Sequence, residues 1–153
     1  MKSEIQGVEI EVVKSDDLET LNQLISVFEE VFEMKNFKRP STGHLMKLLR
    51  KETFFAVVAK VGNQVVGGLT VYILDQYYSE RPLAYIYDLA VLTACQRKGI
   101  GRSLIEFTTA YGKQRGFEEV FVQADKVDEY AVQFYRSTRV TEEEQVVHFY
   151  YIL

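Results

Sequence analysis

Residues 85–107, with the sequence YIYDLAVLTACQRKGIGRSLIEF, constrain the fold of this chain more than any other segment. They begin as an alternating apolar strand, pass through a polar turn that contains Gly99 and Gly101, and continue as an amphipathic helix. A turn that leaves a strand and opens a helix presents backbone N–H groups and the positive end of the helix dipole. The segment predicts an α/β fold with a phosphate or pyrophosphate ligand at this turn. The alternative is a tight helix entry whose basic residues are solvated.

Two common phosphate motifs do not fit this turn. A P-loop needs Gly-Lys-Ser/Thr after four intervening residues, which the turn lacks. A dinucleotide-binding fingerprint needs a third glycine where Leu104 stands. If the turn binds a phosphate, it does so in another way.

The rest of the chain alternates between strand and helix patterns. Helices are predicted within 15–34, where Asp16 and Glu19 suggest a capping box, from about Ser41, and over 103–115 and 128–137. Strands are predicted over 8–13, 53–60, 65–74, 83–91 and 118–125, with a final strand in the segment 146–153. This order predicts a single α/β domain over 1–153. Its mixed sheet is antiparallel early, gains a parallel crossover after Val91, and is flanked by about four helices.

Composition excludes several classes of protein. The 153 residues carry a net charge of −4, which disfavours nucleic acid as a partner and suits a small cationic ligand. The single cysteine, Cys95, allows no internal disulfide and indicates a reducing compartment. No signal-peptide pattern or membrane-length apolar run is present, so a cytoplasmic protein without a membrane partner is expected.

The strand that ends in DLAV, followed by Gln96-x-x-Gly99-x-Gly101 at the opening of a helix, resembles the acetyl-CoA site of the GNAT acyltransferase superfamily. The element order resembles that family across nearly the whole chain. AVQFYRS, at 131–137, resembles its second motif, in which a tyrosine faces the coenzyme sulfur. The resemblance implies acetyl-CoA as co-substrate and no metal. The coenzyme-binding residues that it implies are Leu89, Ala90, Val91, Gln96, Arg97, Lys98, Gly99, Ile100, Gly101, Arg102 and Tyr135.

A closer resemblance links the chain to the type I aminoglycoside 3-N-acetyltransferases, chiefly through YIYDLAV and VQAD. It implies acetylation of the 3-amine of aminoglycoside antibiotics, and hence resistance. The sequence departs from that pattern at STRVTEEEQ, where Arg139 stands near an expected glycine, which puts the substrate range in doubt. Acetylation of a polyamine, another small metabolite or a protein amine, and a coenzyme A sensor without turnover, are the alternatives.

Two residues are candidates for catalysis. Asp88 is an isolated carboxylate in an apolar strand, so it is expected to face a cleft and accept a proton from the acceptor amine. The alternative is a carboxylate hydrogen-bonded to neighbouring backbone. The resemblance implies that Tyr135 protonates the departing thiolate, and the alternative is an ordinary buried tyrosine.

Other carboxylates are candidates for binding a polycationic amine. The predicted acceptor site comprises Asp88, Asp125, Asp128 and Glu129. Helix N-capping by Asp128 and solvated loop charge are the alternatives, and residues 142–144 are expected to be solvated.

Cys95, His44 and His148 are too far apart in sequence to suggest a nucleophile or a metal site. Cys95 and His148 are expected to pack in the core, and His44 could line the acceptor groove. The apolar final strand is expected to be covered or paired in a homodimer, and the alternative is that it lies inside the sheet of the monomer.

Overall fold

The computed structural model describes residues 5–153, which fall into two compact units. The first unit ends at Gln123 and contains a five-stranded sheet with three α-helices. The second unit, Ala124–Leu153, contains the helix α4 (Glu129–Arg136). The candidate site residues are therefore divided between two units.

The sheet of the first unit has the order β1-β2-β3-β4-β5. Neighbouring strands from β1 to β4 are antiparallel, and β4 and β5 are parallel. This is the mixed sheet that the sequence predicts, with its parallel crossover after β4. The strands are β1 (Val8–Val12), β2 (Phe54–Val61), β3 (Gln64–Leu74), β4 (Leu83–Val91) and β5 (Glu119–Val122).

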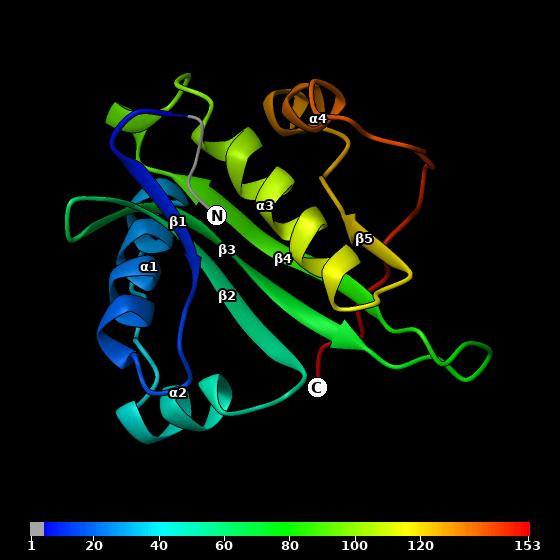
Figure 1. The fold of residues 1–153 in the computed structure, drawn as a ribbon, viewed down its shortest axis with the longest axis horizontal. Coiled ribbons are helices and arrows are strands. Elements are labelled where there is room, and N and C mark those ends of the chain that lie inside the picture. The colour runs from blue at the N-terminus through cyan, green and yellow to red at the C-terminus, as the bar shows by residue number, and fades with distance from the viewer. Residues whose placement is uncertain (1–4) are drawn as a thin grey trace. The chain divides into compact units, whose positions relative to one another are not determined.

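Helices cover both faces of this sheet. Figure 1 shows α3 (Ile100–Gln114) on one face, and α1 (Leu18–Val31) and α2 (Thr42–Leu49) on the other. The Asp17 carboxylate caps α1, accepting hydrogen bonds from the backbone N–H of Thr20 at 3.0 Å and from its hydroxyl at 2.7 Å. The predicted capping box of Asp16 and Glu19 is therefore wrong by one residue.

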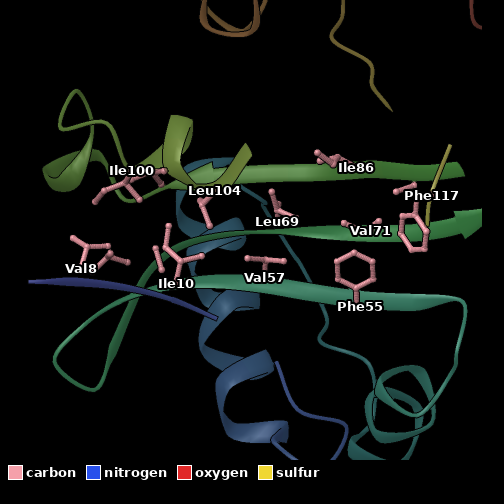
Figure 2. Close-up of a cluster of buried hydrophobic side chains, with 14 residues drawn as sticks. Val8, Ile10, Phe55, Val57, Leu69, Val71, Ile86, Ile100, Leu104 and Phe117 are labelled. Carbon is pink, nitrogen blue, oxygen red and sulfur yellow. The ribbon is translucent and has the colours of Figure 1, made fainter. Parts of the chain in front are cut away.

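Each face of the sheet has its own apolar core. Figure 2 shows the core beneath α3, where side chains of β1 to β4 lie on the same side of the sheet as Ile100 and Leu104. The second core joins α1 and α2 to the opposite face. Alternate residues of β2 enter the two cores, so its continuous apolar pattern is that of a strand buried on both faces.

Gly68 of β3 lets α1 approach the sheet closely. A Cβ atom at this position would lie 2.6 Å from Cδ1 of Leu24 and 2.6 Å from the carbonyl oxygen of Val57. Because one of these neighbours is backbone, the clash cannot be relieved by a side-chain movement alone. Gly68 thus sets the spacing between α1 and the sheet.

Gly68→Ala should lower the free energy of unfolding by about 1 to 3 kcal/mol, because the added methyl group overpacks this contact. Urea denaturation measures the effect. Gly43→Ala in α2 is the matched control, since a Cβ atom there meets nothing within 4 Å. Equal stabilities of the two variants would contradict this account of the α1 contact.

Two predicted boundaries and one predicted strand need correction. The third helix begins at Ile100 rather than at residue 103, and β5 is shorter than the predicted strand over 118–125. The final strand is wrong: residues 146–153 are not in a strand, and their side chains are exposed. An alternating apolar pattern specifies a strand only where a sheet edge is available to pair with it.

Among residues 5–153, no helix combines the length and the apolar character needed to cross a bilayer.

Candidate functional site

The predicted glycine turn lies between β4 and α3. After the 3₁₀ turn η1 (Thr93–Cys95), the backbone takes left-handed conformations at Arg97, with φ of 59°, and at Gly99, with φ of 84°. Gly99 is the N-cap residue of α3, and no side chain at this position accepts a hydrogen bond from the first turn of the helix. Left-handed residues beside a helix start turn backbone N–H groups toward a common point, as in anion-binding turns.

The turn is anchored to the end of β4. The side-chain amide of Gln96 donates a hydrogen bond to the carbonyl oxygen of Val91 at 2.9 Å. The backbone N–H of Ser103 donates to the carbonyl oxygen of Gly99 at 3.0 Å. The N–H groups of Ile100 and Gly101 come before this bond in the first turn of α3. No carbonyl group of the helix can accept a hydrogen bond from them. The exposed basic side chains around this site are Arg97, Lys98 and Arg102.

The second half of β4 extends beyond its parallel neighbour. The register of β4 and β5 ends at Ile86 and Val122, whereas β4 continues to Val91. Residues 87–91 are therefore outside the pairing with β5, although β3 pairs with the other edge of β4. Backbone groups on that edge need partners other than β5. The predicted coenzyme contacts on this edge are Leu89, Ala90 and Val91.

A β-bulge places Asp88 on the α1 face of the sheet. Thr70 of β3 pairs with Asp88, but the next residue, Val71, pairs with Ile86, which leaves Tyr87 as the extra residue. Ile86 belongs to the core beneath α3 and Ala90 to the core beneath α1 and α2. Tyr87 and Asp88 both lie between these two residues, so the bulge brings both to the α1 face.

The Asp88 carboxylate is half-buried and has no hydrogen-bond or ion-pair partner among residues 5–153. The alternative interpretation, a carboxylate bound to neighbouring backbone, has no support in these contacts. Burial raises the pKa of Asp88 above its usual range. A carboxylate with a raised pKa is a stronger base, which suits a proton acceptor.

The second unit holds the other predicted carboxylates. Asp125 is exposed, and its Oδ1 accepts a hydrogen bond from the backbone N–H of Val127 at 3.2 Å. Asp128 caps α4, with its Oδ1 accepting from the N–H of Ala131 at 3.1 Å. Glu129 is exposed in the first turn of the helix. Asp128 therefore has the capping role that the sequence analysis gave as its alternative.

Tyr135 lies in the last turn of α4 and is half-buried. Its ring packs edge-on against Phe134, with centroids 5.0 Å apart.

In the segment that follows α4, Glu143 forms a salt bridge with Arg136, and this hydrogen-bonded pairing lowers the pKa of the Glu143 carboxyl. Arg139 is exposed. One carboxylate of the acidic run over 142–144, that of Glu143, is thus paired with a residue of the second unit.

The remaining polar candidates are Cys95, His44 and His148. Cys95 is half-buried against the core beneath α3, as expected for a packing residue. His44 is exposed on α2, and its backbone N–H donates to the Ser41 hydroxyl at 3.2 Å. His148 is exposed and stacks on Tyr150, so its predicted place in the core is wrong because the final strand does not form. Throughout residues 5–153, no three His, Cys, Asp or Glu side chains gather as metal ligands.

Sequence reasoning missed the bulge and the aromatic side chains around it. Tyr72 of β3 and Tyr85 and Tyr87 of β4 lie on the same face as Asp88. The available signal was the pair Tyr87-Asp88, two adjacent non-core residues in a strand that otherwise alternates. Such a break in alternation marks a bulge.

The glycine turn, the end of β4 that extends beyond β5 and the mixed sheet together point to one protein family. The model of the acetyltransferase (GNAT) family matches residues 18–138. The chain belongs to the GNAT family. A comparison with curated proteins found no significant match.

Solved GNAT structures give the same result. An aminoglycoside acetyltransferase from an uncultured soil metagenomic sample, solved with sisomicin, is 59% identical, with 96% of this chain and 97% of that chain covered and a TM-score of 0.95. The complex described with trehalose gives 60% identity over the same shares and a TM-score of 0.94. A second aminoglycoside acetyltransferase from such a sample is 33% identical, with 95% and 98% covered and a TM-score of 0.88.

A more distant likeness shows the fold alone. An aminoglycoside N-acetyltransferase solved in complex with CoA is 15% identical, with 94% of each chain covered and a TM-score of 0.75. The GNAT fold of this chain is therefore supported across a wide range of sequence identity.

Asp88→Asn should make the protein more stable at neutral pH. Because burial raises the pKa of Asp88 in the folded state, the charged form is disfavoured there relative to the unfolded chain. The stabilising effect of the substitution should appear above the folded-state pKa and disappear below the unfolded-state value of about 3.9. Denaturation at neutral and at acid pH measures it, with Asp75→Asn in the exposed β3–β4 loop as control. A less stable Asp88→Asn variant at neutral pH would show that the carboxylate is paired.

Proposed function

We propose that this protein is an acetyl-CoA-dependent N-acetyltransferase that modifies an amine of aminoglycoside antibiotics. The observation that carries the proposal is the 59–60% identity, over almost the whole chain, to an aminoglycoside acetyltransferase whose complex with sisomicin has been solved. The half-buried, unpartnered carboxylate of Asp88 lies in β4, the strand that leads to the proposed coenzyme turn, and agrees with such chemistry.

The turn between β4 and α3 fits the diphosphate of acetyl-CoA. Its left-handed Arg97 and Gly99 and the first N–H groups of α3 suit an anion, and the exposed basic side chains add positive charge. We assign the acetyl-pantetheine arm to the edge of β4 over 87–91, which has backbone groups available beyond the end of β5. The distant relative solved with CoA supports this choice of ligand through its shared fold.

In the proposed reaction, the acceptor amine attacks the thioester carbonyl directly. A C–N bond forms, the C–S bond breaks, and the products are an N-acetyl amide and the free thiol of CoA. Asp88 takes the proton that the attacking nitrogen loses, directly or through water. A backbone N–H near the end of β4 stabilises the oxyanion. Tyr135 returns a proton to the thiolate, a role supported by the resemblance of 131–137 to the second family motif.

We further propose the 3-amine as the site of acetylation, on the resemblance of YIYDLAV and VQAD to the type I 3-N-acetyltransferases. Asp125 and Glu129 then help to attract the polycationic acceptor. Asp128 contributes only through its charge, because its side chain already caps the start of α4.

The family model runs through the boundary at residue 123, which supports one catalytic domain over the whole chain. The single cysteine supports a reducing, cytoplasmic location.

An acceptor screen tests the proposed function. With saturating acetyl-CoA, thiol release should rise strongly when sisomicin is added and stay near background with spermidine or a lysine peptide. NMR of the product should show the acetyl group on the 3-nitrogen. Release with the other amines alone would replace the aminoglycoside by another acceptor, and coenzyme binding without any release would indicate a sensor.

Gly101→Val should weaken acetyl-CoA binding by about tenfold or more, because its side chain fills space that the diphosphate needs. Gly101 is the second residue of α3, and Gly43 is the second residue of α2. Gly43→Val is therefore a matched control for the effect of valine on a helix start. Calorimetry should give wild-type affinity for the control, and wild-type affinity for both variants would remove the diphosphate from this turn.

Asp88→Asn should reduce kcat by about 10²-fold or more, as expected for loss of a general base. The reduction should be greatest at the acid end of the working range, where the amine is most protonated. Asp125→Asn should instead raise KM with a smaller effect on kcat, since it removes binding shared by ground and transition states. Steady-state kinetics at several pH values separate the two, and wild-type kcat in Asp88→Asn would exclude it as the base.

We also propose that a second copy of the chain covers residues 146–153. Side chains in this segment are apolar and largely exposed, as for Tyr151 at 89%. Such a surface is unfavourable in a free monomer. Light scattering at micromolar concentration should therefore give twice the mass of the chain, and Val147→Asp with Phe149→Asp should reduce it to that of a monomer. A wild-type monomer would reject the dimer.

A further inference from the structure

A continuous row of aromatic rings crosses four strands on the face of the sheet that carries α1 and α2. We call this the aromatic row; in order it comprises Phe54 of β2, Tyr72 of β3, Tyr87 and Tyr85 of β4, and Phe121 of β5. Successive ring centroids are 5.4, 5.7, 5.8 and 4.7 Å apart. These spacings are those of stacked and edge-to-face pairs, so the rings support one another.

The helices on this face leave part of the aromatic row uncovered. The core beneath α1 and α2 takes in Phe54, but Tyr72 and Tyr87 remain 37% and 58% exposed. The hydroxyl of Tyr85 is held by the side-chain oxygen of Gln123, at 2.9 Å. The aromatic row is thus a fixed apolar surface that is open at Tyr72 and Tyr87.

The bulge in β4 adds a negative charge to this surface. Because Tyr87 is the extra residue of the bulge, Asp88 follows it on the same face, opposite Thr70. Burial raises the pKa of Tyr72, and the nearby Tyr87 and Asp88 raise it further. The Tyr72 hydroxyl therefore remains protonated and can donate a hydrogen bond next to the Asp88 carboxylate.

This combination fits one class of acceptor better than others. A rigid amino sugar has an apolar C–H face that packs on an aromatic ring, and its ammonium groups are attracted to ring faces and to a carboxylate. A linear polyamine has the charges but no such face. The open rings offer a surface to the C–H face of an amino sugar, and Asp88 offers a carboxylate to its ammonium groups.

We propose that an amino-sugar ring of the acceptor stacks on Tyr72 and Tyr87 while Asp88 receives its reacting nitrogen. The inference rests on the proposed function, since it takes an aminoglycoside as the acceptor. It assigns acceptor specificity to aromatic side chains of β3 and β4 in addition to the carboxylates.

Calorimetry with sisomicin on the CoA-saturated protein tests the aromatic row. Tyr87→Leu and Tyr72→Leu should each weaken binding by about tenfold, which corresponds to about 1.4 kcal/mol. Tyr87→Phe keeps the ring and should bind within about threefold of wild type, which also guards against a variant that fails to fold. Tyr78→Leu is the control, because Tyr78 is 67% exposed in the β3–β4 loop, outside the aromatic row. Acetyl-CoA affinity should be unchanged in Tyr72→Leu and Tyr78→Leu, since both residues lie outside the proposed coenzyme segment over 87–91.

NMR adds a readout that only ring stacking affects. Sugar C–H protons of bound sisomicin should shift upfield with the wild-type protein and with Tyr87→Phe, and this shift should shrink in Tyr87→Leu. If sisomicin binds the leucine variants with wild-type affinity and the same shifts, the aromatic row is not the platform, and the proposed function stands. If the wild-type protein binds acetyl-CoA but no aminoglycoside, both the proposed function and this inference fail.

Discussion

The backbone pairing of β4 is the constraint on which the site depends. On one edge β4 follows β3 along its length, with one extra residue at Tyr87. On the other edge it pairs with β5 only as far as Ile86. The first feature turns Asp88 to the α1 face, and the second leaves the end of the strand open beside the turn that starts α3. The acceptor and coenzyme surfaces that we propose are consequences of this one strand.

This arrangement is held by the two cores. A half-buried carboxylate without a partner and an open aromatic surface both reduce stability, so the cost must be offset elsewhere. The largest fully buried side chains come from both faces, among them Leu24 of α1, Leu69 of β3 and Leu104 of α3. Close packing at Gly68 fixes α1 against β3, one of the two strands whose register forms the bulge, and against its other neighbour β2. The strands that carry the site are therefore held by both cores.

Much of the fold could be predicted from the sequence because it depends on local patterns. The periodicity of the apolar residues gave the order of elements, and Gly99 gave the turn, since it adopts a left-handed conformation that favours glycine. The adjacent pair Tyr87-Asp88 hints at the bulge, but the register that forms it is set by pairing with β3 and could not be predicted from β4 alone. The final strand failed for a related reason: 146–153 has the composition of a strand, but its partner is not specified by the segment itself. The capping role of Asp128 was visible in the sequence as an alternative, and only the structure decided it.

A crystal structure with CoA and sisomicin would test the central claim most directly. The account predicts the CoA diphosphate on the N–H groups of residues 97–102 and the pantetheine arm along the edge of β4. It also predicts an aminoglycoside amine within hydrogen-bond distance of the Asp88 carboxylate. An aminoglycoside bound away from Asp88, with another group beside the coenzyme sulfur, would contradict the role given to the bulge.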